Sequence, residues 1–448
     1  MSKNKETIDE LLEEVLLPED GQTHEVPANW IWVKSEFVAK WGSGGTPSRK
    51  NSEYYNGNIP WLKTGELRDT VILDSEEKIT EEGLKKSSAK LFPKDSVAIA
   101  MYGATIGKLG ILGIDAATNQ ACAVGVPYAL TDKKFMFYYF LTQRKNLIDK
   151  GKGGAQPNIS QTIIKEFPYI LPPINEQNRI ADKVENLLNK IEEAKQLIEE
   201  AKKSFELRRS AILEKAFSGE LLSSKFNKIT KKINDQITLE IPTHWKIKTL
   251  SEVVQNYNNQ RIPVSQKKRE EMKGDIPYYG ATGIVDFVDG YTHKGEFICI
   301  GEDGANLLSR SKPQAFIIRG KSWVNNHAHV VKMNDNMCNN YLMHYINFIP
   351  LNDYVTGTAQ PKLNRKNLDK IPIVLPPVNE QFTISQKIED LLLKEIEMVN
   401  VCESNLHGID IIKQSIMNKA FRGELGTNDP NEENMIELLK EVLQEQVK

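Results

Sequence analysis

Two long stretches of the chain carry apolar residues at the spacing of a coiled-coil helix. In 171–222, apolar residues recur at alternating intervals of four and three, with Glu and Lys between them. They are Ile180, Val184, Leu187, Ile191, Ala194, Ile198, Ala201 and Phe205. In 375–425 a second seam begins with Ile384, Ile388 and Leu391, and continues after a register change with Val399, Cys402, Leu406, Ile409 and Ile416. Each stretch opens on two prolines and ends near a glycine, so we expect two long helices of equal length. Their equal length favours antiparallel pairing over two core helices in separate domains.

The segments before the two helices show a different pattern. In 28–170 and 243–374, short β-rich runs such as Ser96–Ala100 and Glu296–Ile300 alternate with glycine turns. A helix is expected over Lys134–Asp149. Each segment is therefore interpreted as an α+β globular domain.

The chain repeats itself at a fixed interval. The heptapeptide Leu171–Gln177 recurs as Leu375–Gln381, an offset of 204 residues, and Lys215–Leu221 recurs as Lys419–Leu425 at the same offset. Ala155-Gln156-Pro157 recurs as Ala359-Gln360-Pro361, again at 204, whereas Pro27–Trp30 recurs as Pro242–Trp245 at 215. Each half thus consists of a variable block followed by a segment of fixed length.

A further match joins the two ends of the chain. Glu10–Leu16 (ELLEEVL) resembles Glu437–Leu443 (ELLKEVL), as if a ring had been cut within one repeat. The expected organisation is an N-terminal helical element (1–27), a first domain (28–170), a first long helix (171–222), a linker (223–242), a second domain (243–374), a second long helix (375–425) and a C-terminal helical element (426–448).

The formal net charge of −2 hides a segregation of charge. Residues 28–170 hold 19 basic and 14 acidic residues, and 243–374 hold 17 and 12, so each domain carries +5 and the remainder −12. Basic domains suit phosphate neutralisation, although +5 on one domain alone is unexceptional. We expect two DNA-facing domains on an acidic frame that faces protein partners.

No catalytic motif survives inspection. Gly103–Lys108 has three residues rather than four between its glycines and lacks the Ser or Thr of a P-loop. Glu76-Glu77-Lys78 has the form of a nuclease ExK triplet, but its only nearby aspartate, Asp74, is too close. His327 and His329 lack a third ligand, so neither a metal nor a bound cofactor is expected. The four cysteines lack CxxC spacing, and neither an apolar leader nor a run of ~18 apolar residues occurs, so a cytoplasmic protein is expected.

Residues suited to DNA contact gather in loops of both domains. Arg, Lys, Asn and Gln reach base edges, and Ser or Thr reach phosphates. The candidates of the first domain are Thr46, Ser48, Arg49, Lys50, Lys63, Thr64, Lys108, Gln156 and Asn158. Those of the second are Gln260, Arg261, Lys267, Lys268, Arg269, Asn325, Asn326, Gln360, Lys362, Asn364 and Arg365. For any one of them a solvated surface loop remains the alternative.

These features together resemble the specificity (S) subunits of type I restriction-modification systems. The resemblance covers nearly the whole chain and rests on the duplicated LPPxNEQ and KAFxGEL motifs, the terminal match, Gly103–Lys108 and Ala117–Ala121. The second domain departs from it, with Gly280–Ile284 lacking a following lysine and Asn325-Asn326-His327 replacing Thr118-Asn119-Gln120. The two domains are therefore expected to read different sequences.

The resemblance implies two target recognition domains separated by an antiparallel two-helix coiled coil, with a pseudo-twofold cyclic repeat. Each domain would read one half of an asymmetric bipartite site in double-stranded DNA, and the helix length would set the spacer. The chain itself would be non-catalytic. It would recruit two methyltransferase (M) subunits, which bind S-adenosylmethionine and methylate adenine, and restriction (R) subunits, which use ATP and Mg. A stand-alone DNA-binding regulator and a coiled-coil scaffold with protein-binding ends remain the alternatives; a self-contained methyltransferase or nuclease lacks its motifs.

Overall fold

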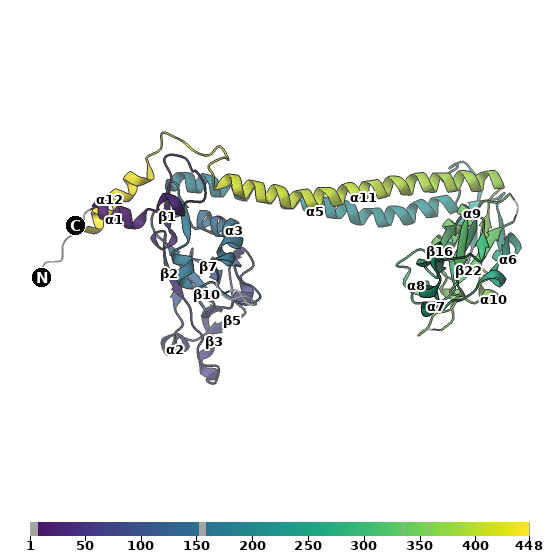
Figure 1. Ribbon diagram of the computed structural model, residues 1–448, viewed down its shortest axis with the longest axis horizontal. Helices are drawn as coiled ribbons and strands as arrows, with labels where there is room; N and C mark the ends of the chain where they lie inside the picture. Colours follow the sequence, from purple (N-terminus) through teal and green to yellow (C-terminus); the bar gives the residue numbers. More distant parts are fainter. Residues whose placement is uncertain (1–7, 152–157, 335, 358, 448) are drawn as a thin grey trace. The chain divides into compact units, whose positions relative to one another are not determined.

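A computed structural model describes residues 8–151, 158–334, 336–357 and 359–447. The chain divides into two compact units, each with its own hydrophobic core. Unit 1 comprises Met1–Gln196 and Asn405–Lys448, and unit 2 comprises Leu197–Ser404. The two predicted long helices are present as α5 (Ile174–Phe217) and α11 (Val378–Ala420), and each contributes one part to each unit (Figure 1).

Unit 1 is a mixed α/β unit. Its sheets are β1–β11, the five-stranded β2-β10-β7-β8-β4 and the four-stranded β5-β3-β9-β6. The strands are β1 (Ile31–Lys34), β2 (Ala39–Ser43), β3 (Tyr55–Leu62), β4 (Thr70–Ile72), β5 (Glu77–Ile79), β6 (Leu91–Phe92), β7 (Val97–Ala100), β8 (Leu109–Leu112), β9 (Ala116–Thr118), β10 (Cys122–Pro127) and β11 (Pro168–Leu171). The helices are α1 (Ile8–Val15), α2 (Glu81–Lys85), α3 (Lys133–Asp149), α4 (Gln161–Lys165) and α12 (Met435–Val447). Helix α3 confirms the helix expected from Lys134, and β7 confirms the apolar run 96–100.

Unit 2 repeats this plan with a four-stranded sheet in place of the five-stranded one and with an additional β-hairpin. Its sheets are β12–β13, β14–β23, β15-β22-β19-β20 and β17-β16-β21-β18. The strands are β12 (Lys228–Lys232), β13 (Thr238–Pro242), β14 (Lys246–Thr249), β15 (Val254–Asn256), β16 (Lys273–Gly280), β17 (Gly283–Val288), β18 (His293–Lys294), β19 (Phe297–Gly301), β20 (Ala315–Ile318), β21 (Lys321–Val324), β22 (Ala328–Met333) and β23 (Pro372–Leu375). The helices are α6 (Leu250–Val253), α7 (Gln266–Glu271), α8 (Asn306–Ser309), α9 (Asn339–Phe348) and α10 (Arg365–Leu368). The segment expected as a linker forms the β12–β13 hairpin.

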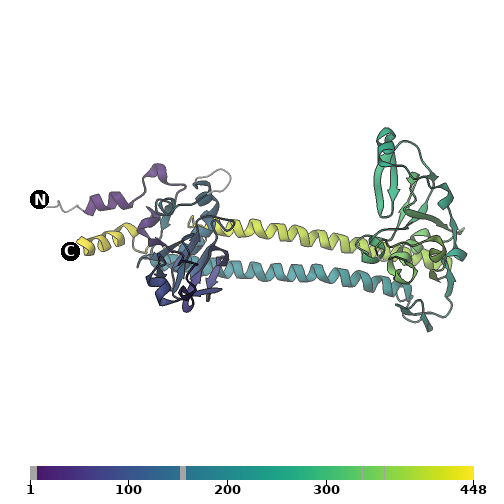
Figure 2. The same ribbon diagram turned by 90° about the horizontal axis from the view of Figure 1, so that it is seen from below.

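The two long helices run antiparallel within each unit (Figure 2). In unit 2 the Lys202 ammonium lies 2.6 Å from the Glu403 carboxylate, and in unit 1 Lys413 lies 3.2 Å from Glu192. Both ion pairs fit the same antiparallel register of α5 against α11. The predicted seam is buried at its ends, as at Ile180 and Ile388, but Ala194 and Ala201 in the middle are exposed. Each helix therefore covers only part of the other's apolar surface.

The repeated motifs form the same joint in each unit. Phe217, at the end of α5, is fully buried against Tyr341 and Tyr345 of α9. Phe421, just after α11, lies in the same way against Phe135 and Tyr139 of α3. In each unit, the KAF motif of one half of the sequence thus places its phenylalanine ring in a core formed by the other half.

The other repeated residues complete these joints. The Trp30 indole N–H donates to Glu176 at 3.1 Å, and that of Trp245 donates to Glu380 at 2.7 Å. Gly219 has φ +77°, and a Cβ there would lie 2.6 Å from Pro242. At Gly423, with φ +74°, a Cβ would lie 2.4 Å from Pro27. The Pro–Trp motif therefore packs against the helix-ending glycine in both units.

The terminal match also has a structural counterpart. Helices α1 and α12 pack together in unit 1, with Leu12, Val15, Met435 and Leu439 buried in its core (Figures 1 and 2). In unit 2 the place before the Pro–Trp motif is taken by the β12–β13 hairpin. The repeat between the two units is therefore interrupted at this point, where unit 1 has a pair of helices and unit 2 has a β-hairpin.

Candidate nucleic-acid interface

A guanidinium–carboxylate cluster holds the candidate loops of unit 1 together. Arg49 lies 2.6 Å from Glu77 and covers the rings of Tyr55 and Trp61, with its guanidinium carbon 4.5 and 5.1 Å from their centroids. The Lys63 ammonium lies 3.0 Å from the same carboxylate. The hydrogen bond from Arg49, and to a lesser extent that from Lys63, holds the pKa of the Glu77 carboxyl below its ordinary value. Glu77, considered above as part of a nuclease triplet, is therefore the counterion of two candidate DNA contacts.

The remaining candidates of unit 1 lie in several settings. The Thr46 hydroxyl donates to Gln120, which joins its loop to the turn after β9. Ser48 and Lys50 are exposed, and among the described residues neither side chain has a partner; Thr64 begins the short helical turn after Lys63. Lys108 belongs to a second cluster, with its ammonium 2.9 Å from Asp69, which also accepts from Arg144. Asn158 is exposed, and Gln156 lies outside the described residues.

Unit 2 gathers several of its candidates around a different carboxylate, Glu302, which directly follows β19. Arg261 donates to the Glu302 carboxylate at 2.7 Å and to the Ala328 carbonyl at 2.8 Å. Lys362 lies 3.4 Å from the same carboxylate, and the buried His329 lies 3.5 Å from it. Burial alone would raise the pKa of Glu302, but these three cationic or potentially cationic groups hold it below its ordinary value. Two segments that the sequence predicted separately, at 261 and 362, are thus joined by one half-buried carboxylate.

Helix α7 divides its three basic residues between two roles. Arg269 donates to Asp286 at 2.9 Å and to the Val264 carbonyl at 2.8 Å, and lies over Tyr278. Lys267 and Lys268 are exposed, and among the described residues neither ammonium has a partner. Arg269 therefore positions the helix, and the two lysines are free to meet phosphates.

A cavity of about 480 Å³ lies beside α7 and is lined by Arg269, Tyr278, Asn325, Asn326 and His327, among others. The buried Asn325 accepts from the His327 amide at 2.8 Å, so it shapes the turn. Asn326 and His327 are exposed, and the His327 ring lies 2.8 Å from Asp303. Asn326 is therefore better placed than Asn325 to reach a base edge.

The other candidates of unit 2 do not share this cluster. Asn364 accepts from the Asn367 amide at 3.0 Å and so caps α10. Arg365 is exposed and lies 3.7 Å from Asp369, and Gln260 and Gln360 are exposed. Sequence reasoning missed the carboxylates Asp69, Asp286 and Glu302, and considered Glu77 only as part of a nuclease triplet, because no local pattern marks an acidic residue whose partner lies elsewhere in the chain.

The sheets also correct two sequence alignments between the domains. Strand β3 pairs in parallel with β9 as β16 does with β21, so Thr118 matches Val324 and Asn119 matches Asn325. The alignment of Asn325-Asn326-His327 with Thr118-Asn119-Gln120 that the sequence suggested is therefore wrong by one residue. Gly280–Ile284 does not replace Gly103–Lys108 either, because it turns from β16 to β17 whereas 103–108 joins β7 to β8.

Comparisons with known proteins agree with this organisation. A family model described as the type I restriction modification DNA specificity domain matches residues 27–203 and 242–400. The MjaIX specificity subunit of Methanocaldococcus jannaschii is 24% identical over 89% of this chain and 94% of that protein. The EcoprrI specificity subunit of Escherichia coli is 25% identical over 85% of this chain and 92% of that protein. A Haemophilus influenzae specificity subunit is 42% identical, but the match spans only 32% of this chain and 36% of that protein.

Solved structures show the same fold. A chain from a study of complex assembly and conformational transition of the type I R-M system aligns with a TM-score of 0.66 and 17% identity over 90% of this chain and all of that one. The HsdS subunit of Thermoanaerobacter tengcongensis aligns with a TM-score of 0.63 and 17% identity over 90% of this chain and 99% of that one. Among the described residues, no helix is both long enough and apolar enough to cross a membrane. The duplicated domains, the paired long helices and the family match agree: this chain belongs to the DNA specificity subunits of type I restriction-modification systems.

Proposed function

We propose that this chain reads an asymmetric, bipartite DNA site, with one half-site for each globular domain. The observation that carries the proposal is that each domain gathers candidate cations around a carboxylate, Arg49 and Lys63 at Glu77 and Arg261 and Lys362 at Glu302, on matching folds but at different places. Matching folds present their loops to DNA in the same way, and different side chains there select different bases. Because the two sets differ, the half-sites differ in sequence.

The partly neutralised clusters suit base reading more than phosphate binding. Arg49 retains 53% exposure of its side chain while Glu77 and two rings fix its position. A guanidinium held in place loses little conformational freedom when it binds a guanine edge. Exposed lysines without a counterion, such as Lys50, Lys267 and Lys268, then supply the phosphate contacts.

The long helices are proposed to set the spacer between the half-sites and to bind M subunits. Helix α11 holds seven acidic and four basic residues. In unit 2 the two helices leave Leu197, Leu207, Leu393, Ile396 and Val401 each more than half exposed. Apolar positions left uncovered on a helix pair are typical of a surface that another protein covers. R subunits would join the M-containing complex, which acts on DNA in the cytoplasm.

Inserting one heptad into both helices is expected to lengthen the spacer by about 3 base pairs. The insertions go between Glu200 and Ala201 and, directly opposite in the observed register, between Ser404 and Asn405. Seven residues preserve the phase of the seam and add ~10 Å at ~1.5 Å per residue, against ~3.4 Å per base pair. Adenine methylation mapped by sequencing measures the spacer; an unchanged spacer in an active complex would refute the role of the helices.

The full proposal is tested by expressing the chain with an M subunit and mapping N6-methyladenine. A bipartite motif is expected, methylated only when this chain is present.

A further inference from the structure

The outer edge of β20 in unit 2 is open where the equivalent strand of unit 1 is paired. The five-stranded sheet of unit 1 ends with β4 paired in parallel to β8. Strand β20 occupies the place of β8, because the amide of Gly301 donates to the Gln314 carbonyl as that of Ala100 does to Lys108. In the described part of unit 2, no strand takes the place of β4.

Asn347 covers part of this edge. In unit 1 the Leu109 amide donates to the Asp69 side chain, and the Asp69 amide donates to the Leu109 carbonyl. In unit 2 the equivalent Ala315 donates to the side-chain carbonyl of Asn347 at 3.0 Å and accepts from its amide at 2.8 Å. Side-chain atoms thus stand in for a backbone neighbour at Ala315. Ile317, two residues on, faces the same edge, and its N–H and C=O are left for another strand.

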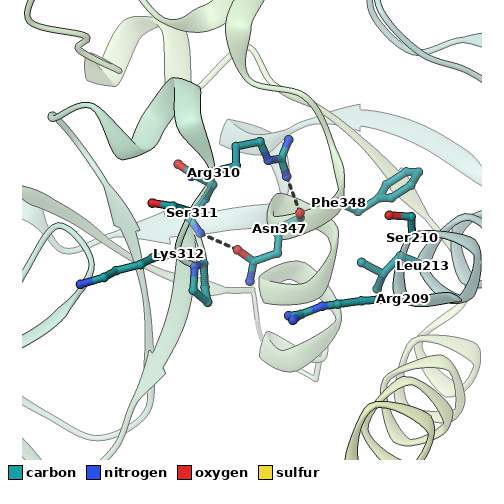
Figure 3. A pocket seen from close by; sticks show the side chains of 10 residues that line it. Arg209, Ser210, Leu213, Arg310, Ser311, Lys312, Asn347 and Phe348 are labelled. Carbon is teal, nitrogen blue, oxygen red and sulfur yellow. Dashed lines mark hydrogen bonds between the residues drawn. The ribbon is translucent and has the colours of Figure 1, made fainter. Parts of the chain in front are cut away.

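A groove runs along this edge. Two adjoining cavities of about 420 and 450 Å³ share Arg209, Leu213, Pro313 and Asn347 in their linings. The second is lined by Ala315, Phe316 and Ile317 of β20, and by α9 and both long helices. Figure 3 shows the first, where Arg209 and Leu213 of α5 face Asn347 and Phe348 of α9 across from Arg310.

The groove contains an unmet hydrogen-bonding group and, in its first cavity, an excess of positive charge. The Oε1 of Gln314, a residue only 2% exposed, has no hydrogen-bond partner. In the second cavity the Nε2 of His344 lies 3.7 Å from the Glu389 carboxylate, which also lines that cavity. Arg209, Arg310 and Lys312 line the first cavity, and its lining contains no carboxylate. The Arg310 guanidinium donates to the carbonyls of Asn347 and Ile349, at the end of α9, and burial lowers its pKa. In unit 1, the Asp69 carboxylate just before β4 pairs with Lys108 and Arg144. The described part of unit 2 has no strand in the place of β4, and therefore no carboxylate equivalent to Asp69.

We propose that an extended, acidic and apolar segment of the M subunit adds to β20 as a further strand; this rests on the proposed function. Unit 1 shows which chemistry fits, because Asp69-Thr70-Val71-Ile72 places a carboxylate before β-branched residues on the same edge. Backbone groups of the added strand pair with Ile317, its carboxylates meet Arg209 and Lys312, and its apolar side chains cover Phe316 and Leu213. A free phosphate fits less well, since it offers nothing to the apolar wall and Gln314 requires a donor.

Hydrogen–deuterium exchange of the full chain, alone and with its M subunit, measures the protection of the amides along this edge directly. The amides of 315–318 are expected to gain protection on assembly, and Ile317 most of all. Failure to assemble would overturn both this inference and the proposed function. Assembly with unchanged exchange at β20 would overturn the inference alone. Protection by a DNA duplex without the M subunit would show a DNA site here and would also overturn it.

Two variants test the contacts separately. Ile317→Pro removes an N–H that no group in the described chain uses, so thermal stability is expected to hold while M-subunit affinity falls about tenfold. Arg209→Glu with Lys312→Glu is expected to lower M-subunit affinity similarly and to leave DNA affinity unchanged. The matched control, Lys267→Glu with Lys268→Glu, makes the same charge change on α7 and is expected to weaken DNA binding only. Wild-type M-subunit affinity in both groove variants would refute the added strand.

Discussion

A chimera in which residues 28–170 are replaced by the matching domain of another specificity subunit is expected to change one half of the recognised DNA site completely. The other half should remain unchanged. All of the candidate contacts in unit 1 come from this segment, and the Arg49–Glu77–Lys63 cluster draws no residue from elsewhere. Base-edge contacts are short-range, so the second domain has no means of sensing the exchange.

The exchange succeeds only if the joint to the helices is kept. The donor domain must supply aromatic residues at the places of Phe135 and Tyr139, which enclose Phe421. The LPP motif that follows stays in place, since Leu171 pairs with Ile31 across β1 and β11. The readout is the methylated motif, and exchange of 243–374 is the reciprocal control. If both half-sites changed in either chimera, reading by two independent domains would be wrong.

Phe217→Ala is expected to destabilise unit 2 by about 3–5 kcal/mol, the usual cost of removing a fully buried aromatic side chain. The ring contacts Tyr341, Tyr345 and Phe348, so its loss leaves a cavity where α5 meets α9. The measurement is thermal or urea unfolding followed by near-ultraviolet circular dichroism, which reports the packing of these tyrosines.

Leu207→Ala provides the matched control on the same helix. That side chain is 75% exposed, so its truncation should change the free energy of unfolding by less than ~0.5 kcal/mol. Equal effects of the two substitutions would mean that the KAF motif does not hold the helix in the core. Phe421→Ala repeats the test in unit 1 and should have an effect of similar size, because its ring is enclosed by Phe135 and Tyr139.

The fold was predictable from the sequence where periodicity and repetition carry the information. The spacing of apolar residues defined α5 and α11 closely, and the repeated KAFxGEL and LPPxNEQ motifs marked their ends. The joint itself was not predictable, because Phe217 and Tyr341 lie far apart in sequence and no short-range pattern connects them.

The candidate site was only partly predictable, for a similar reason. Composition identifies Arg261 and Lys362 as polar loop residues suited to DNA, but Glu302 joins them through the tertiary fold. Asn364 has the right chemistry for a base edge, yet its place before α10 makes it a helix cap. The sequence alignment of the two dissimilar domains was wrong by one residue at Asn119 and Asn325, because only the strand register shows which residues correspond.

The most direct test is the map of N6-methyladenine in DNA from cells that express this chain with its M subunit. The account predicts one motif made of two short specified segments of different sequence, separated by a spacer of fixed length and unspecified bases. A continuous motif, or methylation without sequence preference by a folded complex that contains this chain, would contradict it.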